Sequence, residues 1–379
     1  MIAVNVIYHH FPHYRAAVIH ELATHGKHNY KFWGSLHDFC GIKAYQGNDI
    51  IKINPLEFKQ HGRFWQLKGY WPAVFDNDTD ALIILSNPNL LTSWVIAIIG
   101  RIIGKKIIFW GHGWLKMESW PKSSFRKFYY HLSHMILVYG ERAKSIGISS
   151  GYPAEKIKVI YNSLNFDASI KSLKKIEDSN YNKASLTQSF FQTPTLPLII
   201  CTARITHACR FDILFNASAE LTKQDRPVNI LLVGEGPEEK KLIKLAKQLS
   251  INVHFLGACY DEDILARLIY WSDLTVSPGK IGLTAIHSLT YGTPAITHDD
   301  FDSQMPEVEV IKPGITGDLF KHGDYIDLAL KMQSWMDLKK NRSAIRHDCQ
   351  AVICAQWNPE NQRRLIDQAI SDLFQKGGT

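Results

Sequence analysis

The sequence contains no long uninterrupted apolar run and few cysteines. Its longest apolar stretch, residues 90–103, includes Thr92, Ser93 and Arg101 and is too short to cross a bilayer. The six cysteines are scattered, without the paired spacing of a zinc site, which favours a reduced, cytoplasmic setting. The sequence also lacks the zinc spacing or the aromatic and basic strand signature of a nucleic-acid-binding module. Its first residues, MIAVNVIYHH, indicate a strand and not a secretion signal.

The composition is that of a globular protein with a sizeable core. Hydrophobic residues make up 45% of the 379 residues and charged residues 21%, and this length is enough for two ordinary domains. The formal net charge of +7 is moderate. It permits a phosphate-bearing ligand or an anionic membrane surface as a partner, but it establishes neither.

Segments typical of buried strands alternate with helical segments in both halves of the chain. The strands predicted in the first half are residues 2–8, 81–85, 105–110, 135–139 and 157–161, with helices at 14–25 and 90–103. The strands predicted in the second half are residues 198–202, 229–233, 254–256, 274–276 and 295–297, with helices at 211–222, 238–249, 263–270 and 283–291. This alternation predicts an α/β protein of two doubly wound domains, each with a parallel sheet covered by helices on both faces. Such domains, facing one another across a cleft, bind ligands at the carboxyl ends of their strands.

One polar segment divides the chain. Residues 168–195 are rich in Lys, Ser, Asn and Thr and are predicted to connect two domains, which comprise residues 1–167 and 196–357. Residues 358–379 include an amphipathic helix, which we expect to pack back on the first domain.

The loop after the first predicted strand carries a cluster of polar residues. The stretch HHFPHYR includes His10, Pro12, His13, Tyr14 and Arg15, which we predict to bind an acceptor substrate. A metal site is less favoured, because no carboxylate or cysteine stands at a useful spacing. Ordinary loop polarity is the other alternative.

A histidine between two glycines follows another strand. In FWGHGW, His112 lies between two glycines at the end of a strand, where we expect it to be exposed and mobile enough to contact a ligand. The alternative is that it is only a turn residue.

Two further stretches indicate a phosphate site. In CTARITHACRFDIL, Arg204 leaves a strand and Arg210 opens the next helix, and two guanidinium groups beside a helix N-terminus suit a pyrophosphate. In SPGKIGLTAIHSLTYGTPAI, a helix begins near Gly282, where backbone N–H groups and the helix dipole favour an anion. Arg210 could instead be a solvated first-turn residue. The turn VGEGPE is weak evidence by itself, and the acids at 261–263 are better explained as a helix cap than as a metal site.

Taken in order, these stretches resemble a glycosyltransferase of the GT-B fold, close to glycosyltransferase family 4. The resemblance covers nearly the whole chain, and the order and spacing of its motifs are specific, although several are weak individually. The motifs are FPHYR, WGHG, KIKVIYNSLNFD, ARIT with RFDIL, VGEGPEEKKL, VHFLG, SPGKIGLTAIHSLTYGTPAI and TGDLF. FPHYR, WGHG and GLTAIHSL are similar to a branch of bacterial enzymes that assemble surface polysaccharides.

The resemblance implies a retaining transfer of a sugar from a nucleotide-sugar, the co-substrate, to a hydroxyl of a glycan or lipid-linked acceptor. It implies no bound metal and no other cofactor, with the acceptor on the first domain and the nucleotide-sugar on the second. Cationic side chains and helix N-terminal amides would then stabilise the nucleoside diphosphate leaving group.

The same resemblance assigns the site residues. The implied catalytic residues are His112, Arg204 and Arg210. The implied donor-binding residues are Cys209, Gly234, Ala258, Cys259, Gly279, Lys280, Ile281, Gly282, Leu283, Thr284 and His287. Within this set, His112 would contact the donor sugar, the turn at Ala258 and Cys259 would meet the base, and His287 would lie near the ribose.

Three positions depart from the family pattern. The family commonly has two glutamates in the last motif, and their positions fall on Gly279 and His287. A histidine can still hydrogen-bond a ribose hydroxyl. The family also has a lysine where this chain has Cys209, which cannot supply a positive charge. Either Arg210 substitutes for that lysine or the activity is weak.

Other functions share parts of this pattern. A nucleotide-sugar epimerase has the same fold, and a catalytically silent nucleotide-binding subunit would suit Cys209. A nicotinamide-dependent dehydrogenase is disfavoured, because the first turn lacks the glycines that a dinucleotide pyrophosphate needs. For the apolar helix at 90–103, burial in the core is favoured, and the alternative is peripheral contact with the inner face of the cell membrane, helped by Arg101, Lys105 and Lys106.

Overall fold

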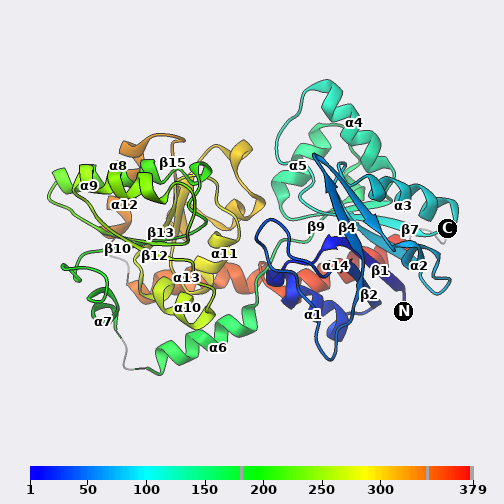
Figure 1. Cartoon of the computed structure of the whole chain (residues 1–379), viewed down its shortest axis with the longest axis horizontal. Coiled ribbons are helices and arrows are strands. Elements are labelled where there is room, and N and C mark those ends of the chain that lie inside the picture. Colours follow the sequence, from blue (N-terminus) through cyan, green and yellow to red (C-terminus); the bar gives the residue numbers. More distant parts are fainter. Residues whose placement is uncertain (180–181, 339–340, 376–379) are drawn as a thin grey trace. The chain divides into compact units, whose positions relative to one another are not determined.

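The computed structural model describes residues 1–179, 182–338 and 341–375 and divides into two compact units (Figure 1). The first unit comprises residues 1–165 and 356–379, and the second comprises residues 166–355. Residues 168–195, predicted as a connection, instead include two helices of the second unit, α6 (Phe166–Glu177) and α7 (Lys183–Thr187).

The first unit contains a parallel sheet of seven strands in the order β3-β2-β1-β6-β7-β8-β9. These strands are β1 (Ala3–His10), β2 (Asn29–Ser35), β3 (Ile53–Pro55), β6 (Ala81–Leu85), β7 (Lys106–Trp110), β8 (Met135–Val138) and β9 (Ile157–Val159). An antiparallel hairpin, β4 (Glu57–His61) and β5 (Phe64–Lys68), is separate from this sheet. The central strands are near-continuous apolar runs, because helices cover both of their faces.

Helices on the two faces of this sheet bury two separate hydrophobic clusters. The helices of the unit are α1 (Ala16–His25), α2 (Trp71–Phe75), α3 (Leu91–Ile102), α4 (Trp120–His131), α5 (Glu141–Ser149) and α14 (Pro359–Gln375). One cluster includes Val18, Ile366 and Ile370 from α1 and α14, and the other includes Ile96, Tyr129 and Ile146 from α3, α4 and α5. The terminal helix α14 therefore packs beside α1 in the first unit. Residues 376–379 of the predicted terminal segment lie outside the described residues.

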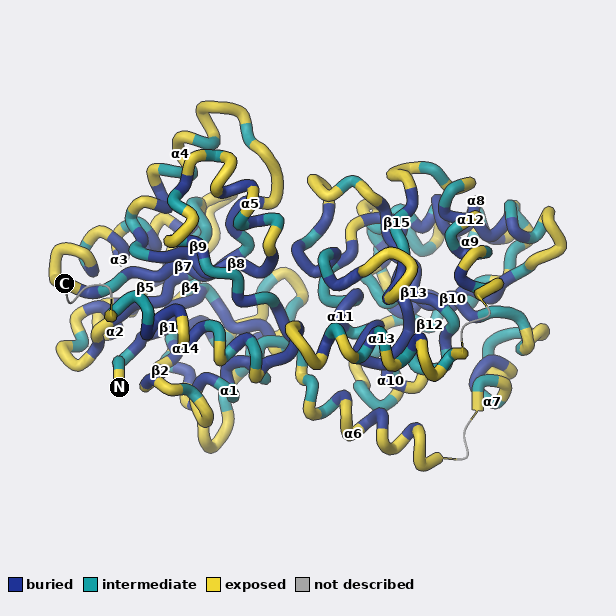
Figure 2. The backbone as a smooth tube through the Cα atoms, turned by 180° about the vertical axis from the view of Figure 1, so that it is seen from behind, coloured by how far each residue is buried: buried dark blue, intermediate teal, exposed yellow. Residues whose placement is uncertain are grey.

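The second unit repeats the architecture with a parallel sheet of six strands in the order β12-β11-β10-β13-β14-β15. Its strands are β10 (Leu198–Thr202), β11 (Asn229–Val233), β12 (Asn252–Gly257), β13 (Leu274–Ser277), β14 (Ala295–His298) and β15 (Gly317–Phe320). Besides α6 and α7, its helices are α8 (Phe211–Lys223), α9 (Glu239–Leu249), α10 (Glu262–Trp271), α11 (Leu283–Thr290), α12 (Tyr325–Met336) and α13 (Arg342–Ala355). Figure 2 shows the strands of both sheets as the buried centre of each unit. The prediction of two doubly wound α/β units is confirmed.

Short 3₁₀ helices occur in several loops. They are His13–Arg15, Ala154–Lys156, His207–Cys209, Phe301–Ser303 and Pro306–Val310. In the part of the chain that the structure describes, no helix is both long and apolar enough to cross a membrane.

Candidate functional site

The sheet of the second unit has a switch point between β10 and β13. These two strands are adjacent and parallel, and the chain continues from β10 toward β11 on one side and from β13 toward β14 on the other. The loops that leave such a pair at its carboxyl ends diverge and leave room for a ligand. Arg204 lies in the loop after β10, and residues 279–284 lie in the loop after β13.

Backbone hydrogen bonds join the loops at this edge. The amide of Gly279 donates to the carbonyl oxygen of Cys209 at 3.0 Å, and the hydroxyl of Thr284 donates to the carbonyl oxygen of Thr202 at 3.0 Å. The bonds Ala203 N to Val233 O (3.1 Å) and Gly234 N to Gly257 O (2.8 Å) add the loops after β11 and β12. The predicted donor-side residues Arg204, Cys209, Arg210, Gly234, Ala258, Cys259, Gly279, Lys280, Ile281, Gly282, Leu283 and Thr284 therefore share one edge of the sheet.

Two of the cations at this edge are uncompensated. Arg204 and Lys280 are exposed, and within the described residues neither side chain has a hydrogen-bonding or ionic partner. Arg210 differs, because its guanidinium bonds both carboxylate oxygens of Asp212 at 3.0 Å. The carboxylate raises the pKa of Arg210 and compensates its charge. Arg204 and Lys280 are therefore better suited to meet a phosphate than Arg210.

The N-terminus of α11 lies beside these cations. Gly282 is the N-cap of α11, and as a glycine it has no side chain that could cap the helix. The hydroxyl of Thr284 is already used on Thr202, so the first-turn amides are what the helix offers to a ligand. The free amides and the dipole at a helix N-terminus favour an anion.

Cys209 lies in a tight turn. It ends the 3₁₀ helix His207–Cys209, and its thiol donates to the carbonyl oxygen of Arg204 at 3.0 Å. Its Sγ also lies 3.4 Å from Oγ1 of Thr206. The thiol thus stabilises the turn through these contacts and supplies no positive charge.

Gly279 is required by close packing. A Cβ built on Gly279 would lie 2.1 Å from the carbonyl oxygen of Ala208 and 2.9 Å from Cα of Cys209. Real Cβ atoms do not approach backbone this closely. With this backbone the position accepts no side chain, which accounts for a glycine where the family pattern has a glutamate.

His287 is paired with a carboxylate from the neighbouring helix. Its Nε2 lies 2.9 Å from Oε1 of Glu262, and the hydroxyl of Tyr291 donates to the same oxygen. The imidazole side chain is 14% exposed and the carboxylate side chain 42%. Burial works to raise the pKa of Glu262, but the bonds from His287 and Tyr291 outweigh it and hold the pKa below its ordinary value. A carboxylate is therefore present beside His287, although it comes from α10.

The other acids near Glu262 have structural roles. The carboxylate of Asp261 accepts from the amide of Ile264 at 3.0 Å, so it caps α10 as predicted. Asp263 bonds Ser172 at 2.6 Å and Lys175 at 2.7 Å, which joins α10 to α6.

Substituting Glu262 with Gln should release His287 while preserving the fold. We expect a loss of at most about 1 kcal/mol in the free energy of unfolding at neutral pH, because the carboxylate is partly screened by solvent. The pKa of Glu262 is lower in the folded state than its ordinary value of 4.5. Its contribution is therefore present above pH 4.5 and is lost as the pH falls through the folded-state pKa. Urea unfolding of Glu262→Gln and wild type should converge below that pH.

A matched control is Glu239→Gln, which removes the charge from the first residue of α9. Helix-dipole effects are the same for both variants, so a loss confined to Glu262→Gln isolates its pairing with His287 and Tyr291. Equal losses in the two variants would show that the pairing contributes nothing.

In the first unit, β1 ends in two neutral histidines, His9 and His10. Burial, with the charge of nearby Arg15 adding to it, lowers the pKa of His9 to about 3 and that of His10 to about 4. His10 is 2% exposed, and among the described residues neither of its ring nitrogens has a hydrogen-bond partner. The ring of His9 packs against Phe39, Phe58 and Trp65 at centroid distances of 5.0–5.4 Å. Neutral imidazoles suit an uncharged hydroxyl, because each can donate and accept.

A second cluster connects the predicted residues Arg15 and His112 through Tyr139. The guanidinium of Arg15 bonds the hydroxyl of Tyr139 and lies 5.2–5.3 Å from the ring centroids of Tyr8, Trp110 and Tyr139. The ring of His112 packs edge-on against Tyr139 at 5.2 Å. Gly113, at φ +65°, turns the chain directly after His112. Tyr139, which follows β8, was not predicted, because its sequence context is only the end of an apolar strand.

The remaining predicted residues of this loop are held by the backbone. Pro12 pairs with Ala44, and the amide of His13 donates to Lys43 O at 2.9 Å. The side chain of His13 is exposed, whereas Tyr14 is half-buried. Among the described residues, the ligand atoms close enough for a metal ion belong to His20, Glu21 and His25 on α1, not to the predicted loop.

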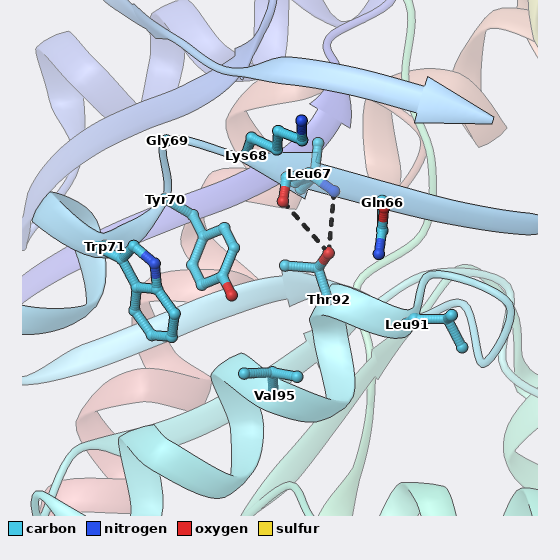
Figure 3. Close-up of a pocket in the computed structure, with 9 residues that line it drawn as sticks. All are labelled: Gln66, Leu67, Lys68, Gly69, Tyr70, Trp71, Leu91, Thr92 and Val95. Atoms are coloured by element: carbon cyan, nitrogen blue, oxygen red, sulfur yellow. Dashed lines mark hydrogen bonds between the residues drawn. The ribbon is translucent and has the colours of Figure 1, made fainter. Parts of the chain in front are cut away.

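A surface pocket lies elsewhere in the first unit. It has a volume of about 280 Å³ and lies between β5, α2 and the start of α3 (Figure 3). The hydroxyl of Thr92 bonds the backbone of Leu67 there, with the Leu67 amide donating at 2.9 Å. This pocket contains none of the predicted site residues.

The chain is similar to known glycosyltransferases. Residues 183–352, nearly all of the second unit, match the family model described as glycosyl transferases group 1. A GDP-mannose-dependent alpha-(1-6)-phosphatidylinositol dimannoside mannosyltransferase of Mycobacterium tuberculosis is 29% identical over 117 residues. That match covers 30% of this chain and 30% of the relative, so the chain matches less than a third of that protein's length.

Solved structures resemble the chain over nearly its whole length. The Anabaena protein HepE, solved in complex with UDP, has a TM-score of 0.72 at 16% identity and covers 98% of this chain and 100% of its own. The apo form of the lipopolysaccharide outer core galactosyltransferase WaaB has a TM-score of 0.69 at 15% identity and covers 98% of this chain and 99% of its own. This likeness establishes the fold, which is the GT-B fold predicted from the sequence.

Proposed function

We propose that the chain is a retaining, metal-independent glycosyltransferase of family 4. It would move a sugar from a nucleotide-sugar to a hydroxyl of a glycan or lipid-linked acceptor during bacterial surface-polysaccharide synthesis. The observation that carries the proposal is the pair of uncompensated cations, Arg204 and Lys280, beside the uncapped N-terminus of α11 at the β10–β13 switch point. The match of the second unit to glycosyl transferases group 1 supports it.

The chemistry requires that the departing nucleoside diphosphate be stabilised as negative charge develops on it. Arg204, Lys280 and the first-turn amides of α11 are the charges and donors at the edge of the sheet where that diphosphate would lie. Cys209 contributes no charge, and Arg210 is compensated by Asp212. We therefore assign charge stabilisation chiefly to Arg204 and Lys280, and orientation of the ribose to the pair of His287 and Glu262.

The acceptor would bind in the first unit, through the loop at His10–Arg15. The neutral imidazoles of His9 and His10 suit a sugar hydroxyl, and the Arg15–Tyr139–His112 cluster fixes the orientation of His112. Surface-polysaccharide synthesis is supported by the likeness to WaaB, a lipopolysaccharide outer core galactosyltransferase. We also propose that the protein works in the cytoplasm, in peripheral contact with the inner face of the cell membrane.

Release of nucleoside diphosphate from UDP-glucose and from GDP-mannose, with EDTA present, tests this proposal. We expect slow release from one donor alone and faster release when a lipid extract of bacterial membranes is added as acceptor. A requirement for divalent metal would contradict metal independence.

The Cys209 turn favours a second candidate, a nucleotide-binding subunit with little or no activity, because the usual lysine charge is missing. Binding of a donor that is never consumed would identify it. Conversion of the donor without any acceptor would instead identify an epimerase.

A further inference from the structure

An apolar stripe runs along the outer face of α3. Leu91, Val95, Ile98 and Ile102 are 42%, 39%, 45% and 78% exposed, and their spacing puts them on one helical face. Ile96, on the opposite face, is completely buried. The expectation that the apolar residues of this helix belong to the core is therefore correct for one face and wrong for the other.

The stripe continues on α4. Trp120, Phe125 and Phe128 are 80%, 57% and 66% exposed. The ring of Trp94 on α3 lies 5.4 Å from that of Phe125 and 6.0 Å from that of Phe128, so the two exposed faces adjoin. In Figure 2 both helices carry exposed stretches on the surface of the first unit. Monomeric soluble proteins rarely expose contiguous apolar patches of this kind without a partner.

The chain segment that contains α3 and α4 carries almost entirely positive charge. Between residues 81 and 135 the chain has one acid, Glu118, and that carboxylate is bonded by Arg126 through two contacts of 2.7 Å. The same segment has seven lysines and arginines: Arg101, Lys105, Lys106, Lys116, Lys122, Arg126 and Lys127. Arg101, Lys116 and Lys122 are exposed, whereas Lys105 is buried and donates to the carbonyl oxygens of Asp76 and Thr79. Lys105 is thus removed from the predicted set of membrane contacts.

We propose that the α3–α4 face docks on an anionic lipid bilayer. Its aliphatic and aromatic side chains would enter the boundary between headgroups and acyl chains, and the exposed cations would meet the anionic headgroups. Charge complementarity favours a bilayer over a second copy, because copies of this face would bring like charges together. The proposal rests on the peripheral contact in the proposed function and names the surface that makes it.

Binding of the full chain to vesicles tests this surface. The probes are vesicles of phosphatidylcholine alone and of phosphatidylcholine mixed with phosphatidylglycerol, sedimented without donor or acceptor. We expect binding to the anionic vesicles that weakens as salt is raised. Two variants should bind the anionic vesicles at least about tenfold more weakly than wild type does. They are the double variant Val95→Glu with Ile102→Glu and the single variant Lys122→Glu.

Matched controls lie on the second unit. The control variants are Leu330→Glu and Lys241→Glu. Leu330 is 54% exposed, and the side chain of Lys241 is 74% exposed. Both variants should bind the vesicles as wild type does. Absent or salt-insensitive binding, or an equal loss in the controls, would overturn the proposal. Self-association that Val95→Glu with Ile102→Glu abolishes, without vesicle binding, would assign the face to a second copy instead. Nucleoside diphosphate release is measured separately, so failure here leaves the proposed transferase activity standing.

Discussion

Replacing Arg204 with Ala should lower turnover by about 10²–10³, which corresponds to roughly 2.7–4 kcal/mol of lost transition-state stabilisation. Arg204 is exposed and, among the described residues, has no side-chain partner, so the free energy of unfolding should not change. If Arg204 acts mainly on the departing diphosphate, kcat falls while KM changes little. Steady-state release of nucleoside diphosphate and urea unfolding measure the two effects.

The control for this prediction is Arg226→Ala. Arg226 precedes β11, at the amino end of that strand, and bonds Asp337 at 2.6 Å. The Arg226→Ala substitution removes the same positive charge from the second unit, but at a position away from the carboxyl ends of the strands. Turnover should therefore remain that of wild type. Equal turnover in Arg204→Ala and wild type would remove Arg204 from the site.

Introducing the family's first glutamate, Gly279→Glu, should lower the stability of the protein and should not raise its activity. Any side chain at this position would collide with the carbonyl oxygen of Ala208 and break the 3.0 Å bond from the Gly279 amide to Cys209. Overpacking of this kind costs about 1–3 kcal/mol, and the displaced loop would carry the neighbouring phosphate contacts with it. Urea unfolding should therefore show a lower stability, and nucleoside diphosphate release should be lost.

Lys280→Glu is the control that introduces a carboxylate without the steric collision. It places the same group one residue later, at an exposed position, so the free energy of unfolding should remain that of wild type even though a cation of the site is lost. A Gly279→Glu protein as stable as Lys280→Glu and more active than wild type would show that the loop adopts another packing.

Ten strands of the two sheets were predictable because their signal is local, whereas β2, β3 and β15 were not predicted. Strands such as β6, with the sequence ALIIL, and β11, with NILLV, are continuous apolar runs, as expected for parallel strands buried on both faces. The hairpin β4–β5 was missed, because its burial pattern alternates weakly and most of its residues are exposed. The exposed stripe of α3 was not distinguished from the buried face for a different reason: both faces of the helix carry aliphatic residues, so composition does not separate them.

The loops of the candidate site could be located from the sequence, but the pairings of their side chains could not. The motifs gave the loops at the carboxyl ends of the strands, which the backbone bonds of Cys209 and Gly279 bring together. Pairings between distant segments left no local signal. Glu262 meets His287 from another helix, 25 positions earlier in the chain. The collision at Gly279 depends on the backbone of Ala208, and the compensation of Arg210 by Asp212 depends on rotamers that the sequence does not specify.

The most direct test of the central claim is a calorimetric titration of the full chain with UDP, GDP, CDP and ADP in the presence of EDTA, repeated on Arg204→Ala. The account predicts saturable binding of one nucleotide by wild type without metal, and markedly weaker binding by the variant. The nucleotide that binds also identifies the donor class. Binding that requires a divalent metal, or that is unchanged in Arg204→Ala, would contradict a metal-free diphosphate site at the β10–β13 switch point.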